Sequence, residues 1–143
     1  MKLVQISVFL ENRKGRLYEA CALLGKHKIN IRALSIAESE EFGVLRLVVD
    51  NPEMALRIFK ENGFVAKFTD IVAVEVADKP GGLAEVLKVL YEHDINVEYM
   101  YGFTEKFSDN ALLVFRFDDP DKAIEILKKN KIKVIGKADI INF

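Results

Sequence analysis

The sequence predicts a protein of the α+β class in which one six-element unit, β-α-β-β-α-β, occurs twice in tandem. Two observations lead to this prediction. Apolar residues recur with the periods typical of strands and helices, in that order, through the first half of the 143-residue chain. From about Asp70 the same order begins again, and residues 66 or 68 positions apart are often identical. A repeat of this length indicates that each copy is one structural unit.

The first copy shows the order of elements directly. Its expected strands cover residues 2–10, 29–37, 43–50 and 64–68, and its expected helices cover residues 16–27 and 52–62. Alternation in the first strand, typical of half-buried strands, places Gln5 and Ser7 on its polar face. Leu17 and Cys21 recur at helical spacing, so we expect both to pack in the core. Pro52 suits the first turn of a helix, where its missing N–H is not needed.

The second copy opens with an apolar strand, residues 71–76, and repeats the first with small changes. Gly81 follows Gly15 by 66 positions, whereas Pro120 follows Pro52 by 68, so the second hairpin loop is two residues longer. Because parallel neighbours require right-handed crossovers, each copy is expected to be ferredoxin-like. Such a unit is a four-stranded antiparallel sheet with two helices on one face.

The repeat divides the chain into two expected domains, residues 1–69 and 70–143. A unit of about 70 residues is marginally stable alone, because a small domain buries a smaller share of its surface. The junction at residues 64–76 has no Pro-, Gly- or Ser-rich linker. We therefore expect the two units to pack side by side, with an exchange of strands across the junction as the alternative.

The composition indicates a globular protein of the cytoplasm. Half of the residues are apolar, and a net charge of -1 gives no general attraction to nucleic acid or to anionic membranes. Cys21 is a single cysteine and forms no internal disulfide, and the N-terminal apolar run is too short for a signal peptide or membrane span. His27 and His93 lack partners at metal-ligand spacing. We expect neither metal nor cofactor.

A glycine pair marks the junction between the first strand and the first helix of the second copy. The run there is Asp78, Lys79, Pro80, Gly81, Gly82 and Leu83. Two glycines leave no side chain over the first helical turn, so its unpaired N–H groups stay open to an anion such as a carboxylate. The alternative is a helix start in which Asp78 and Pro80 only set the entry angle of the chain.

Together these motifs resemble the ACT domain, a small regulatory fold of amino-acid metabolism. Its members often show Asp-Lys-Pro-Gly-x-Leu after the first strand and Ile-Asn-Ile at the second strand. The second copy matches this pattern at Asp78, Lys79, Pro80, Gly81, Leu83, Ile95, Asn96 and Val97. The resemblance covers nearly the whole chain as two tandem copies, with no catalytic domain attached.

The resemblance implies that a free amino acid binds where two units meet, with the loop and helix start of one unit facing the second strand of the other. The ligand carboxylate would lie near the N–H groups of Gly81 and Gly82, or of Gly15 in the sister site. Asp78 or Asn12 would meet its ammonium group. The second strands would contribute Asn30 and Asn96, and the apolar wall would consist of Leu17, Ile31, Leu83 and Val97.

Two features leave alternatives open at these sites. In the first copy, Lys14 stands where proline is usual, and the long side chain of Arg16 could fill the pocket over the helix start, so that one site would be degenerate. For Asn30 and Asn96, the alternative role is a helix-to-strand turn that tolerates unusual backbone angles.

The function expected from these features is that of a regulatory protein that senses an amino acid and acts on a partner enzyme. A regulatory or assembly subunit that binds no small molecule is the alternative. The third strands are apolar on both faces, so we expect a homodimer. Catalytic motifs are lacking, although acylphosphatase shares the fold and uses an arginine in the first loop, which keeps Arg13 or Arg16 as a minor enzyme hypothesis.

Overall fold

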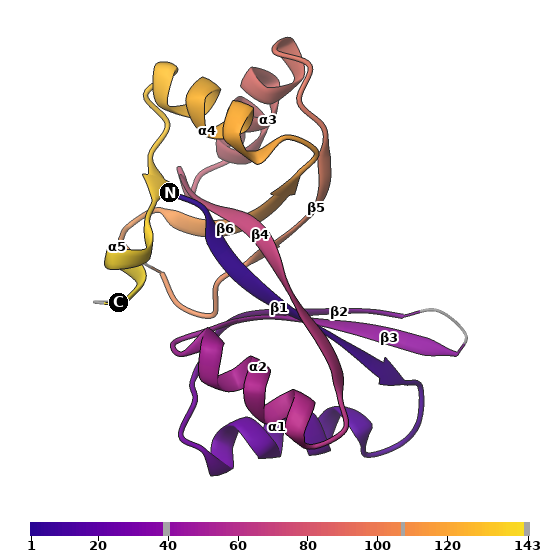
Figure 1. Cartoon of the computed structure of the whole chain (residues 1–143). Coiled ribbons are helices and arrows are strands. Elements are labelled where there is room, and N and C mark those ends of the chain that lie inside the picture. The colour runs from indigo at the N-terminus through magenta and orange to yellow at the C-terminus, as the bar shows by residue number, and fades with distance from the viewer. Residues whose placement is uncertain (39–40, 107, 142–143) are drawn as a thin grey trace. The chain divides into compact units, whose positions relative to one another are not determined.

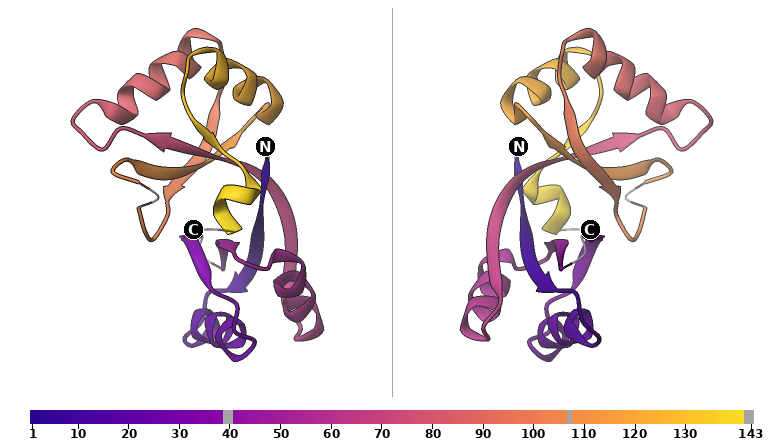
Figure 2. Two further views of the ribbon diagram at one scale, coloured as in Figure 1. Left: turned by 90° about the vertical axis from the view of Figure 1, so that its left-hand side faces the viewer. Right: turned by 90° about the vertical axis from the view of Figure 1, so that its right-hand side faces the viewer.

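The computed structural model describes residues 1–38, 41–106 and 108–141. They form two compact units, a first unit of residues 4–69 and a second unit of residues 1–3 together with 70–143. In each unit, a pair of helices lies on one face of antiparallel strands (Figures 1 and 2). None of the helices in the described residues is long and apolar enough to span a membrane.

The described residues of the first unit follow the predicted order. Its elements are β1 (Leu3–Glu11), α1 (Arg16–Lys26), β2 (Ile31–Glu38), β3 (Phe42–Val49), α2 (Pro52–Glu61) and the first part of β4 (Val65–Val76). The strands lie in the order β2-β3-β1-β4, with β3 antiparallel to both β1 and β2. Pro52 opens α2 as predicted, and the Asn51 side chain caps the helix by accepting the N–H of Met54 at 3.3 Å.

The second unit repeats this arrangement. After the rest of β4 come α3 (Gly82–Glu92), β5 (Val97–Gly102), β6 (Ala111–Phe117), α4 (Pro120–Lys129), β7 (Val134–Ile135) and a short α5 (Lys137–Ile141). Its strand order, β7-β4-β6-β5, is that of the first unit when the elements are matched. Asp119 caps α4 by accepting the N–H of Lys122 at 3.1 Å. The prediction of two ferredoxin-like units is confirmed.

One strand differs from the expected pattern. The strands predicted at residues 64–68 and 71–76 are parts of the single twelve-residue strand β4. Its residues 65–69 belong to the first unit and its residues 70–76 to the second. No glycine or proline interrupts residues 64–76, so nothing in the sequence ends the extended backbone between the two parts.

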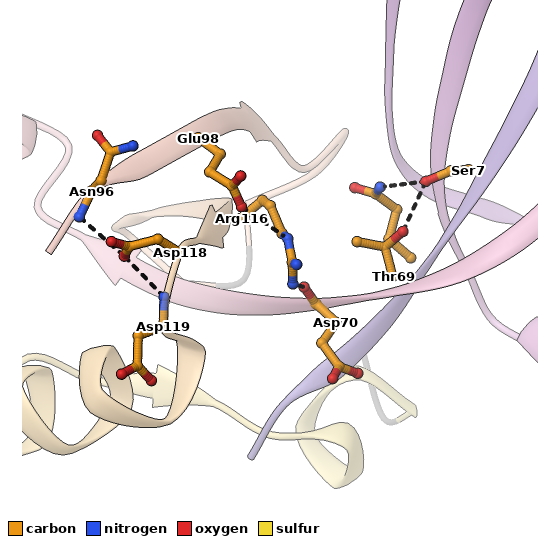
Figure 3. A network of polar contacts seen from close by, with 9 residues as sticks. Ser7, Thr69, Asp70, Asn96, Glu98, Arg116, Asp118 and Asp119 are labelled. Atoms are coloured by element: carbon orange, nitrogen blue, oxygen red, sulfur yellow. Dashed lines mark hydrogen bonds and ion pairs between the residues drawn. The ribbon is translucent and has the colours of Figure 1, made fainter.

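The polar face of β1 is buried, contrary to the expectation of a half-buried strand. Gln5 and Ser7 are 0% and 4% exposed. Gln5 Nε2 donates to Ser7 Oγ over 3.0 Å, and the Ser7 hydroxyl lies 3.1 Å from that of Thr69 on β4 (Figure 3). These hydrogen bonds replace the water that burial removes. The burial escaped prediction because alternation shows which side chains share a face, not what covers that face.

The helices that cover the sheets contribute to the two cores together with the strands. Ala20, Leu24 and Phe59 bury their side chains in the first core, and Val86 and Leu90 do so in the second.

Two residues of α1 depart from the core prediction. Leu17 is 41% exposed, and Cys21 is half-buried, with burial raising the pKa of its thiol. Leu17 lies in the first turn of α1, and helical spacing does not reveal where along its length a helix is covered.

The connection into α3 leaves no room for a side chain at Gly82. A Cβ there would lie 1.9 Å from the Ala77 carbonyl oxygen, whereas one at Gly81 would meet nothing within 4 Å. We expect Gly82→Ala to lower the free energy of unfolding by about 3 kcal/mol, because the backbone must shift. Gly81→Ala should cost about 1 kcal/mol, because its φ of 83° disfavours an L side chain. Urea denaturation of both variants measures the difference.

Gly25→Ala in α1 is the matched control. Its added Cβ meets nothing within 4 Å, and its φ is not in the left-handed region, so stability should rise by about 0.5 kcal/mol. A Gly82→Ala protein as stable as the Gly25→Ala protein would contradict this account of the α3 start.

Candidate functional site

The glycine pair of the second unit forms a type II β-turn in front of α3. The N–H of Gly82 donates to the carbonyl of Lys79 over 3.0 Å. Gly81 occupies the third position with φ 83° and ψ -7°, a conformation that this turn type reserves for glycine. Pro80 occupies the second position, which its fixed φ suits. The turn therefore enters the helix with a well-determined backbone.

The first unit builds the same turn without the proline. The N–H of Arg16 donates to the carbonyl of Arg13 over 3.3 Å, and Gly15 has φ 86° and ψ -13°. Lys14 takes the place of proline. The departure of the first copy from the sequence pattern thus leaves the backbone unchanged and alters only the side chains.

The turn geometry changes which N–H groups α3 presents. Gly82 was expected to offer its N–H to a ligand, but that group is used inside the turn. No side chain caps α3 among the described residues, so the next N–H groups at its N-terminus are those of Leu83 and Ala84. Ala84 was not predicted. The Pro-Gly pair could have indicated this, because it favours a type II turn, in which the N–H of the following residue donates to the carbonyl of the first turn residue.

Asp78 already has a cationic partner. The Nζ of Lys106, in the segment between β5 and β6, donates a hydrogen bond to the Asp78 carboxylate. This hydrogen bond raises the pKa of Lys106. The ammonium of Lys106 thus occupies the position in which the sequence predicts the ammonium of a ligand.

A second contact fastens the same β5–β6 segment. The Ser108 hydroxyl donates to Glu75 Oε1, and Asn110 Nδ2 donates to the same oxygen over 3.2 Å. Lys133 lies 3.8 Å from the other carboxylate oxygen. The hydrogen bond from Ser108 lowers the pKa of Glu75, with Asn110 and Lys133 adding to the effect, so the carboxylate is charged at neutral pH. The two extra residues of this loop were the sequence signal for these contacts.

The two asparagines at the second strands are held through their backbones. The N–H of Asn96 donates to Asp118 Oδ1 over 3.2 Å (Figure 3). The N–H of Asp118 donates back to the Asn96 carbonyl, also over 3.2 Å. Asn30 and Asp50 form the same reciprocal pair, at 3.1 and 3.2 Å.

The positive φ angle that the sequence suggested for these asparagines belongs to the residues two positions before them. Lys28 and Asp94 both have φ 58°, in the left-handed region. The asparagines therefore connect each helix to its strand, but they are not the strained residues of the turn.

Within the second unit the expected site residues fall into two groups. Asp78, Pro80, Gly81, Gly82 and Leu83 lie at the N-terminus of α3, whereas Asn96 and Val97 follow its C-terminus. The helix has eleven residues, about 16 Å at 1.5 Å per residue. The groups are thus too far apart for one small molecule to touch both.

The first unit is divided in the same way. Asn12, Gly15 and Leu17 lie at the start of α1, and Asn30 and Ile31 lie beyond its end. The N–H of Asn12 donates to the carbonyl of Glu41 over 3.0 Å, which joins the turn to the β2–β3 hairpin. A site that uses both groups requires a second ACT-like unit.

Arg16 covers the helix start of the first unit. Its side chain is 13% exposed, with nitrogens 3.2 Å from Glu11 and 3.0 Å from Glu19. Its guanidinium carbon lies 3.9 Å from the ring centroid of Phe64. The hydrogen bond from Arg16 lowers the pKa of Glu19. Arg16 therefore forms part of a packed ionic cluster.

This ionic cluster argues against an acylphosphatase-like use of Arg13 or Arg16. Arg13 lies 3.4 Å from Glu11 and 3.5 Å from Glu19, so both arginines of the first loop lie among carboxylates. Their positive charges are thus already paired with carboxylates, which disfavours the binding of a phosphate group.

The comparisons with known proteins agree with this fold. The family model described as an ACT domain pair matches residues 1–143. The structure of protein BT0572 from Bacteroides thetaiotaomicron is 39% identical, with a TM-score of 0.93, and the alignment covers 100% of this chain and 98% of that one. No curated protein matches the sequence.

Two more distant structures share the fold. The ligand-free regulatory subunit of aspartate kinase from Thermus thermophilus is 14% identical, with a TM-score of 0.62, over 88% of this chain and 91% of that one. The corresponding subunit from Thermus flavus is 14% identical with a TM-score of 0.62, over 88% and 90%. The motifs, the doubled β-α-β-β-α-β order and the family match lead to one conclusion: this chain belongs to the family of ACT domain pairs.

Proposed function

We propose that this ACT domain pair is a non-catalytic regulatory protein that binds a free amino acid and thereby changes its affinity for a partner enzyme of amino-acid metabolism. The observation that carries the proposal is the glycine turn before α3, whose helix presents N–H groups without a side-chain cap. A helix start of this kind favours a carboxylate through its dipole. The same fold serves as the regulatory subunit of aspartate kinase in Thermus thermophilus, so the fold is compatible with such a role.

The proposed ligand contacts follow from the groups at the turn. The carboxylate would accept from the N–H groups of Leu83 and Ala84, and the α-ammonium would bind the Asp78 carboxylate in place of Lys106. The far side of the ligand would meet the second strand of another ACT unit, where Asn30 or Asn96 opens the strand. Leu17 and Ile31, or Leu83 and Val97, would supply the apolar wall.

Displacement of Lys106 provides the proposed coupling. When a ligand ammonium binds Asp78, the β5–β6 segment loses the contact of Lys106 and keeps those that Ser108 and Asn110 make with Glu75. A partner that binds only one arrangement of the segment would then respond to the ligand. By linkage, it would change the ligand affinity by the same factor.

An assembly role has separate support on β2. This strand lies at the end of the strand order in the first unit, and Leu34 and Ile36 on it are 42% and 54% exposed. Apolar side chains on an open sheet edge suit pairing with another chain. We propose that a second copy of this chain packs against β2, which would make the protein a homodimer.

A thermal-shift series with the twenty amino acids tests ligand binding. A ligand at a hundredfold excess over its dissociation constant should add about 2.7 kcal/mol of stability and raise the melting temperature. If none of the twenty shifts the transition, the assembly role without a small ligand replaces the sensor role.

Asp78→Asn tests the proposed ammonium contact. Removing a charged hydrogen-bond partner costs about 1.5–3 kcal/mol, so affinity for the amino acid found by thermal shift should fall at least about tenfold by calorimetry. Glu61→Gln is the control, because it removes an exposed carboxylate paired with Arg57 on α2. Equal affinities of the two variants would exclude Asp78 from the site.

Ile36→Lys tests the assembly surface. A charge on the open edge of β2 should convert dimers to monomers at micromolar concentration, as measured by sedimentation velocity. Val65→Lys, at an exposed position of β4, is the control and should leave the sedimentation unchanged. If the wild-type protein sediments only as a monomer, the homodimer proposal is wrong.

A further inference from the structure

The second unit contains a cavity of about 360 Å³ that none of the roles above uses. It lies between one face of α3, the end of β4 and the segment that joins α4 to β7. The lining residues that matter here are Glu75, Glu85, Val86, Val89, Lys131 and Ile132. Among the described residues that were predicted to bind a ligand, only Gly82 lines this cavity. Asp78 is not part of its lining. The volume is in the range of small-molecule sites, about 300–1,000 Å³.

The chemistry of the cavity combines an aliphatic floor with charges of both signs. Val86, Val89 and Ile132 supply branched aliphatic surface, and Val86 is 5% exposed. Glu75 is held by Ser108, Asn110 and Lys133, so its charge is already balanced. The cavity therefore offers two other charges, those of Glu85 and Lys131, to whatever enters it.

Glu85 and Lys131 line the same cavity without pairing. Neither forms an ion pair with any residue that the structure describes, although they have opposite charges. Glu85 lies in the first turn of α3, and Lys131 follows α4 with its backbone in the left-handed conformation, φ 59°. A molecule that carries both an ammonium and a carboxylate can pair with both groups. A simple anion or a simple cation satisfies only one of them.

The first unit replaces these features at the corresponding positions. Arg16 corresponds to Gly82 and Phe64 to Ile132, and these two large side chains stack on each other at 3.9 Å. The counterpart of Glu85 is Glu19, whose carboxylate is taken by Arg16 at 3.0 Å. Gly63 stands where the second unit has Lys131. The charge pair and the open floor are therefore features of the second unit alone.

We propose that this cavity is a second binding site, inside one unit, for a small aliphatic α-amino acid. The ligand carboxylate faces Lys131, its ammonium faces Glu85, and its side chain packs on Val86 and Val89. The inference rests on the proposed function in that the ligand is a free amino acid. It differs in place, because the site needs no second unit and does not use Asp78.

The test is a titration of the full chain with three probes, followed by ¹H–¹⁵N correlation spectra. L-Valine carries both charges, isovalerate lacks the ammonium, and isobutylamine lacks the carboxylate. L-Valine should shift the amide signals of α3 and of residues 130–133, and each single-charge probe should bind at least about tenfold more weakly. Equal binding of isovalerate and L-valine would overturn the zwitterion assignment.

Four variants locate the site. Val89→Phe narrows the cavity and should abolish L-valine binding, whereas Leu23→Phe, at the corresponding half-buried position of α1, should bind as the wild type does. Glu85→Gln and Lys131→Gln change exposed side chains, so they keep the test valid if Val89→Phe does not fold. Each should weaken binding at least about tenfold.

Asp78→Asn separates this inference from the proposed function. If it leaves the shifts of residues 130–133 intact while Lys131→Gln removes them, the cavity is the site for L-valine. If Asp78→Asn removes binding and the cavity variants do not, the cavity proposal is overturned and the turn site stands. If no amino acid shifts any signal, both proposals fail.

Discussion

The second unit depends on how closely α3 begins against the end of β4. At Gly82 the helix backbone comes so near the Ala77 carbonyl that there is no space for even one methyl group. The type II turn before it uses the Gly82 N–H and directs the chain into the helix. Since the direction of α3 is set here, this contact also positions Glu85 and Val89, which lie along the next turns of the same helix.

The two copies share their backbone devices and differ in the side chains placed on them. Both have the glycine turn and an Asn or Asp cap with proline on the second helix. Both also have an Asn–Asp pair at the second strand, joined by two hydrogen bonds, one of them accepted by the Asp carboxylate. In the first copy, Arg16 packs on Phe64 over the helix start, whereas the second copy has Gly82 and Ile132 at those positions. The helix start is thus covered by a large side chain in one copy and left without one in the other.

Much of the fold could be predicted from the sequence because its signals are local. Periodicity located the helices, and the prolines at 52 and 120 located two helix starts. The repeat showed that the same order of elements recurs, and the rule of right-handed crossovers predicted the sheet. The continuity of β4 was missed because two apolar runs do not reveal whether the backbone between them stays extended. The burial of Gln5 and Ser7 depends on what covers a sheet face, which no local pattern reports.

The sequence predicted the backbone turns of the candidate site, but it did not predict most of the side-chain contacts there. The glycines marked both turns, but the use of the Gly82 N–H follows from turn type, and the pairing of Asp78 with Lys106 joins residues 28 positions apart. Leu17 shows the limit of helical spacing, since a residue in the first turn can lie beyond the sheet. The cavity beside α3 combines four separate segments, so only the folded chain brings its charges together.

The continuous strand β4 has a consequence for how this protein can evolve and unfold. Because residues 65–69 serve one unit and residues 70–76 the other, the boundary between the units falls within a strand rather than in a loop. Neither half can be excised as an intact module without fraying a strand of its neighbour. Because one strand serves both units, we expect local unfolding of one unit to fray the part of β4 that the other unit uses.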